Sequence, residues 1–269
     1  MQIRAGYEIE YECPQPTPKL LVLSIHPSRF ADLSTPHVIQ FDPPIPSANY
    51  EDGFGNICTR IVAPAGRLKI FADFQIGDTG LPDFVPVGVM QTPVEELPKE
   101  AIVFLLGSRY CETDRLADFA WATFRDVAPG WTRVQAICDY VHDRIAFNYK
   151  NADPMRSAFG GNQDQTGVCR DFAHLAITLC RCMNIPARYC TGYLGDIGVP
   201  PDPNPMDFSA WFDVFLDGTW YTCDARHNHP RIGRILMARG RDATDVAIST
   251  SFGPSTLVGF KVVTDEVKG

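Results

Sequence analysis

The chain lacks any apolar run approaching the length of a membrane-spanning helix, and it does not open on a charged-then-apolar leader. It also lacks internal repeats and low-complexity tracts, which argues against a solenoid or a disordered segment. Excess positive charge is missing too, because the formal net charge is −8, and this disfavours nucleic acid or an anionic membrane as a partner. We therefore expect a cytoplasmic protein that binds neither nucleic acid nor a membrane.

The cysteines lack the spacing of a disulfide framework or of a metal site. There are nine, an odd number, and no CxxC pair occurs among them. Cys180 and Cys182 would point to different sides of a helix, so a zinc site with Cys169, Cys190 and His174 is disfavoured. We expect reduced thiols in a bacterial cytoplasm, no bound metal and no cofactor.

The 269 residues, 45% of them hydrophobic and 21% charged, can bury a sizeable core. Short alternating segments separated by proline and glycine predict a β-rich N-terminal domain over residues 1–80, built as a small sandwich or an open barrel. Residues 81–110 follow as a linker, and residues 111–269 form the remaining domain. Two amphipathic helices are expected in the latter, beginning near residues 113 and 132.

One cysteine stands directly after a glycine turn and at the start of a strong helical pattern. From Cys169, apolar residues recur at spacings of three and four up to Asn184 and Pro186, where the helix should end; they are Phe172, Leu175, Ala176, Leu179 and Met183. A thiol in the first turn of a helix is favoured as the nucleophilic thiolate. The alternative is a buried structural cysteine.

The next segment reads as a hairpin with Asp217-Gly218 as its two-residue loop. Pairing Leu216 with Thr219 places one set of side chains on a common face: Ser209, Trp211 and Asp213 with Thr222, Asp224 and Arg226. Ser209 and Asp224 become diagonal neighbours beside the helix-start thiol, which is the layout of a cysteine-base-carboxylate triad. A serine at the base position, however, cannot take a proton from a thiol at neutral pH.

These segments resemble the bacterial transglutaminase-like superfamily, whose members are usually described as cysteine proteases. The resemblance rests on the sequences of Gly167–Leu175 (GVCRDFAHL), Ile185–Leu194 (IPARYCTGYL) and Asp224–Asn228 (DARHN) with the hairpin between them. It covers roughly residues 110–260, and more loosely the β-rich N-terminal domain that is often fused to this core. It implies an α+β, papain-like core over 111–269, with the nucleophile helix packed on an antiparallel sheet.

The resemblance also implies a reaction and its residues. Cys169 matches the family's nucleophile and Asp224 its carboxylate, whereas the family's His-Ala-Trp reads Ser209-Ala210-Trp211 here. The implied activity is cysteine-dependent hydrolysis of a peptide or protein amide, or acyl transfer to an amine, through a thioester. Because Ser209 replaces the histidine, we expect an inactive or impaired enzyme. Three alternatives stay open: an introduced substitution, a natural peptide-binding or scaffolding member without catalysis, and a base supplied by another residue.

Other side chains are candidates for supporting roles. Gln163 and Gln165 precede the nucleophile and could help bind an oxyanion, although solvated loop side chains would look the same. Trp211 retains the family's position beside the base. Arg226 could bind a substrate carboxylate or simply pair with Asp224 or Asp213.

Three histidines are candidates to replace the missing base. His174 lies five residues after Cys169 and points away around the helix, so a buried structural role is favoured. His227 would face the core if its strand continued that far. His229 lies beyond the expected strand and could fold back toward the site.

Overall fold

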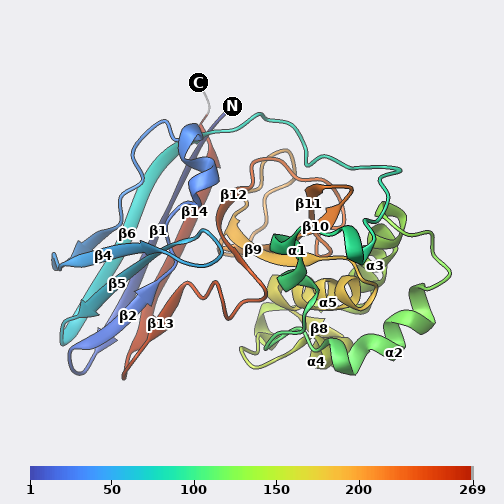
Figure 1. Cartoon of the computed structure of the whole chain (residues 1–269). Coiled ribbons are helices and arrows are strands. Elements are labelled where there is room, and N and C mark those ends of the chain that lie inside the picture. Colours follow the sequence, from blue (N-terminus) through green and yellow to red (C-terminus); the bar gives the residue numbers. More distant parts are fainter. Residues whose placement is uncertain (268–269) are drawn as a thin grey trace.

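A computed structural model describes residues 1–267 of the chain. It has a β-sandwich on one side and a mixed helix-and-sheet core on the other (Figure 1). Residues 268–269, the end of the expected core domain, lie outside the described part. The predicted α+β class is confirmed.

The N-terminal part forms two four-stranded sheets that enclose one apolar core. One sheet has the order β14-β1-β6-β3 and the other β13-β2-β5-β4. The N-terminal strands are β1 (Gln2–Cys13), β2 (Thr17–Leu21), β3 (Gln40–Asp42), β4 (Ser47–Glu51), β5 (Ile57–Ala63) and β6 (Gly66–Gly77), and a 3-10 helix, η1 (Pro27–Asp32), follows β2. Alternate side chains of β6 point inward, as its sequence pattern predicts. The sandwich is the simpler of the two architectures expected for this region.

The last two strands of the chain return to this sandwich. β13 (Ser249–Ser251) pairs with β2, and β14 (Thr256–Glu266) runs antiparallel to β1 (Figure 1). The core expected over 111–269 therefore differs in its final segment, which completes the N-terminal sheets. Pairing between residues more than 200 positions apart leaves no local signal in the sequence.

The segment that joins the two parts is extended at first and helical later. It has no helix or strand between residues 78 and 93, and it continues as η2 (Val94–Glu96), α1 (Lys99–Ile102) and η3 (Val103–Leu105). Ala101 and Phe104 are buried, and Ala101 packs in a small cluster with Phe215 of the core sheet. The second half of the predicted linker is thus packed structure.

The core consists of helices and short segments around a four-stranded sheet of order β11-β10-β9-β12. Its elements are α2 (Thr113–Phe124), α3 (Trp131–Arg144), β7 (Ala146–Phe147), η4 (Tyr149–Asn151), α4 (Ala158–Asp164), β8 (Thr166–Gly167), α5 (Cys169–Cys182), β9 (Ala187–Tyr193), β10 (Ser209–Leu216), β11 (Thr219–Cys223) and β12 (Ile235–Gly240). Helices α2, α3 and α5 begin within two residues of the expected starts.

Helix α5 packs on the sheet through the apolar stripe that its sequence predicts. Phe172 and Ala176 belong to the same buried cluster as Ala210, Phe212 and Val214 of β10. This packing brings the first turn of α5 to the start of β10. Within residues 1–267, no helix combines the length and the apolar character needed to cross a bilayer.

Candidate active site

The start of α5 is held by a carboxylate that folds back onto it. The side chain of Asp171 accepts a hydrogen bond from the Val168 N–H at 2.8 Å, which satisfies one of the free donors at the helix N-terminus. Gly167 makes this possible, because a Cβ at that position would lie 2.5 Å from the Asp171 Oδ2. Arg156 and Arg170 approach the same buried carboxylate at 3.4 and 3.6 Å. Cys169, the first helical residue, is therefore held on a rigid support.

The Cys169 thiol is half-buried against the start of β10. Burial raises the pKa of the Cys169 thiol to about 11, although the Arg226 guanidinium and the Ala210 N–H, within hydrogen-bonding reach of the sulfur, act in the opposite sense. Burial thus outweighs the groups that favour the thiolate. The thiol is protonated at neutral pH, so nucleophilic attack requires a base.

The hairpin has the expected register and turn. Leu216 pairs with Thr219 and Phe212 with Cys223. Asp217 and Gly218 both have positive φ, at 45° and 78°, as a two-residue hairpin loop requires. The predicted pairing does not continue to Ser209, because β11 ends at Cys223. Ser209 instead pairs with Gly192 on the neighbouring strand β9.

Asp224, the first residue after β11, is buried and fully bonded. Its Oδ2 accepts from Arg234 Nη2 at 2.8 Å and lies 2.8 Å from His227 Nδ1, while its Oδ1 accepts from the backbone N–H groups of Arg226 and His227. Burial alone would raise the pKa of Asp224, but Arg234 and His227 oppose it and hold the pKa well below its usual range. The carboxylate is therefore ionised at neutral pH.

A cavity of about 110 Å³ lies beside these groups. Ser209, Arg226 and His227 line it, and so do Asp207 and Tyr149. Arg226 and Asp207 are also the two charges that most affect the Cys169 thiol, lowering and raising its pKa respectively. The cavity, Ser209 and the nucleophile thus belong to one site.

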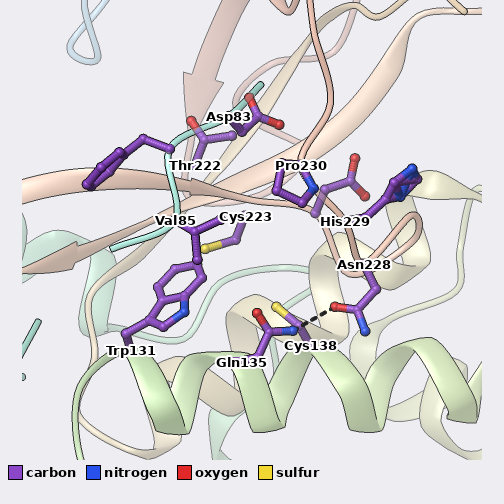
Figure 2. Close-up of a pocket in the computed structure, with 12 residues that line it drawn as sticks. Asp83, Val85, Trp131, Gln135, Cys138, Thr222, Cys223, Asn228, His229 and Pro230 are labelled. Atoms are coloured by element: carbon purple, nitrogen blue, oxygen red, sulfur yellow. Dashed lines mark hydrogen bonds between the residues drawn. The ribbon is translucent and has the colours of Figure 1, made fainter. Parts of the chain in front are cut away.

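The turn that follows Asp224 is anchored to helix α3. The Asn228 N–H donates to the Asp224 carbonyl at 2.8 Å, and the Asn228 side chain exchanges hydrogen bonds with Gln135 and Asp139 of α3 at 2.9 and 2.8 Å. Figure 2 shows the bond between Gln135 and Asn228 at the edge of a second cavity, of about 60 Å³. His229 lines this second cavity and not the one that contains Ser209.

The residues predicted to support the site lie in different environments. Gln163 and Gln165 are exposed, and neither lines the cavity of Ser209, which agrees with the solvated alternative. Trp211 is buried, and the Arg234 guanidinium lies 5.1 Å from its ring centroid. Trp211 therefore supports the cation that holds Asp224.

Arg226 lies in the cavity, and its guanidinium carbon is 3.8 Å from the ring centroid of Phe147. The pairings considered for it from the sequence are wrong, because Arg188 binds Asp213 and Arg234 binds Asp224. Within residues 1–267, no carboxylate forms an ion pair with Arg226. Its side chain therefore remains a candidate for substrate binding.

Hydrogen bonds show where each of the three candidate histidines points. His174 is fully buried, and its Nε2 accepts from the Ala243 N–H at 3.1 Å, which confirms a structural role. The strand ends at Cys223, so the condition under which His227 would face the core is not met, and the turn carries its ring back to Asp224. His229 bonds the His227 carbonyl at 3.1 Å.

Two residues around Asp224 were not predicted as its partners. Arg234 left no sequence signal, since it follows ten positions later at the edge of β12. His227 did leave a sequence signal, because an aspartate favours a tight turn in which its side chain accepts hydrogen bonds from backbone N–H groups ahead of it. Asp224 does so with the N–H groups of Arg226 and His227. Within residues 1–267, no group of three or more His, Cys, Asp or Glu side chains could hold a metal ion.

Comparison with known proteins agrees with this geometry. Residues 119–225 match the transglutaminase-like superfamily. The fold resembles the crystal structure of a candidate cysteine protease from Cytophaga hutchinsonii, with a TM-score of 0.85 and 27% identity, over 100% of this chain and 91% of that one.

Mycobacterial proteins are similar in sequence. An uncharacterised protein from Mycobacterium tuberculosis is 28% identical over 238 residues, which cover 78% of this chain and 73% of the relative. One from Mycobacterium leprae is 37% identical over 84 residues, but these cover only 30% of either chain. The resemblance predicted from the sequence motifs is thereby confirmed, because residues 119–225 match the transglutaminase-like superfamily.

Proposed function

We propose that this chain is a cysteine-dependent hydrolase of peptide or protein amides. One observation carries the proposal: Cys169, at the start of α5, packs against the same buried cluster as Ala210, one residue from the family's base position, while the ionised Asp224 directly follows strand β11 of the same sheet. A nucleophile on a helix start and a carboxylate on an adjacent hairpin are the fixed parts of a thiol triad.

The reaction would proceed through a thioester. The Cys169 sulfur attacks the amide carbonyl carbon while a base takes the thiol proton, and the Cys169 N–H with one further donor stabilises the oxyanion. The same proton then passes to the departing amine as the C–N bond breaks. Water releases the acid from the thioester, whereas an amine acceptor gives transamidation.

Ser209 supports a second candidate function. With a hydroxyl at the base position and a thiol whose pKa is raised to about 11, the site would bind an amide without cleaving it. Such a chain would be a peptide-binding or scaffolding member of the superfamily. The expectations of an impaired enzyme and of a cytoplasmic location stay predictions.

Substitution of Cys169 by alanine is expected to reduce hydrolysis of an amide and peptide panel to the rate without protein, because no other group forms the thioester. Product amines and free acids would be measured by mass spectrometry, with and without an added primary amine to detect transamidation. Cys58→Ala is the matched control, since Cys58 is a buried thiol in the N-terminal sandwich. Binding of a panel peptide by both the parent and Cys169→Ala, with cleavage by neither, would favour the peptide-binding function.

A further inference from the structure

The carboxylate that should orient the family's histidine already holds an imidazole from another position. His227 Nδ1 lies 2.8 Å from Asp224 Oδ2, and the His227 backbone N–H donates to Asp224 Oδ1 at 3.1 Å. An ionised carboxylate can only accept, so the Nδ1 of His227 carries the proton. The neutral ring then has its lone pair on Nε2, which is the atom that a general base uses in a triad.

The His227 imidazole is partly exposed and borders a cavity of the candidate active site. Its side chain is 18% exposed and lines the same cavity as Ser209 and Arg226. Within residues 1–267, no hydrogen bond engages the Nε2 atom of His227. The ring therefore has one nitrogen committed to Asp224 and the other available.

Hydrogen bonds of the neighbouring residues hold the His227 ring in place. Asn228 joins the turn to α3 through Gln135 and Asp139, and Asp224 is held by Arg234. Orientation of an imidazole by a carboxylate and of that carboxylate by further bonds is typical of a catalytic base.

We propose that His227 supplies the general base of this site in place of the residue at position 209. The inference rests on the proposed hydrolase function and adds the group that Ser209 cannot provide. His227 Nε2 accepts the proton of the Cys169 thiol as the sulfur bonds to the carbonyl carbon. The imidazolium returns that proton to the leaving amine, and in the second half-reaction the ring takes a proton from water.

The protonation state of the ring agrees with this role. Burial lowers the pKa of His227, although Asp224 raises it, and the net shift is downward. The ring is therefore neutral at pH 7 and can accept a proton. The charged groups around it are Asp224, Arg226, Arg231 and Asp202.

Acylation of Cys169 by p-nitrophenyl acetate tests this inference without a known natural substrate. His227→Asn places an amide N–H near the original Nδ1 and removes Nε2, so the contact with Asp224 can persist while the base is lost. We expect the acylation rate to fall by about 10²- to 10⁴-fold, the usual contribution of a general base. His37→Asn is the matched control, because the His37 ring packs on Phe74 in the N-terminal sandwich, and it should leave the rate unchanged.

The pH profile separates a catalytic from a structural role. In the parent, the acylation rate should rise with pH through one titration below neutrality and then level off, and this titration should be missing in His227→Asn. A rate in His227→Asn close to that of the parent, or a reduced rate that keeps the same titration, would overturn the assignment of His227. Absence of Cys169 acylation in the parent would instead contradict the hydrolase function itself.

Discussion

Substitution of Asp224 by asparagine is expected to lower kcat for amide hydrolysis by about 10³- to 10⁴-fold, the scale seen when a triad carboxylate loses its charge. The carboxylate accepts from His227 Nδ1 at 2.8 Å and so fixes the tautomer with a free Nε2. An amide at this position can present its N–H groups to Nδ1, which moves the ring proton to Nε2 and removes the base. The measurement is kcat on the best substrate of the amide panel.

Asp213→Asn is the control for the general effect of losing a buried carboxylate on this sheet. Asp213 is 7% exposed and is paired with Arg188 and Thr222, away from the cavity of Ser209. It should change stability without a comparable change in kcat. Equal kcat values for Asp224→Asn and the parent would show that the carboxylate does not act in catalysis.

Replacement of Arg234 by methionine is expected to lower the free energy of unfolding by about 3 to 5 kcal/mol, because it leaves a buried carboxylate without its cation. Arg234 is 8% exposed and bonds both Asp83 and Asp224 at 2.8 Å. It thereby joins the extended segment, the hairpin and β12. Urea unfolding of the parent and the variant at neutral pH measures the difference.

The stabilisation should depend on pH in one direction. The pKa of Asp224 in the folded protein lies well below that of an unfolded aspartate, which is about 4. The stabilisation by the ionised Asp224 is therefore fully present above about pH 4 and is lost as the pH falls further. The difference in the free energy of unfolding between the parent and Arg234→Met should narrow over the same range. Arg4→Met removes an exposed pair with Asp73 and should have little effect. A similar loss in both variants would contradict the account of Arg234.

Local pattern sufficed for much of the core. Apolar spacing located α5, because a helix that buries one face must repeat its apolar residues at three and four. The Asp217-Gly218 loop fixed the hairpin register, and hence the common face of Trp211 and Asp224, since side chains alternate along a strand. Asp224 follows the last residue of β11, and Arg234 contacts both Asp224 and Trp211.

The features that the sequence did not predict lie where the chain leaves regular structure or pairs with a distant segment. Alternation along a strand stops at Cys223, so it could not place His227 against Asp224. The return of β14 to β1 rests on pairing between distant segments, which no local pattern encodes. The raised pKa of the Cys169 thiol could not be read from the sequence either, because burial is a tertiary effect.

Peptide mapping of the parent protein after brief reaction with p-nitrophenyl acetate and acid quenching tests the central claim most directly. The account predicts an acetyl thioester on Cys169, formed faster than on any other cysteine, since this thiol is half-buried while the others are buried. Cys169→Ala should abolish the rapid phase of p-nitrophenolate release. An unmodified Cys169, or acetyl groups spread evenly over the cysteines, would contradict the assignment of Cys169 as the nucleophile.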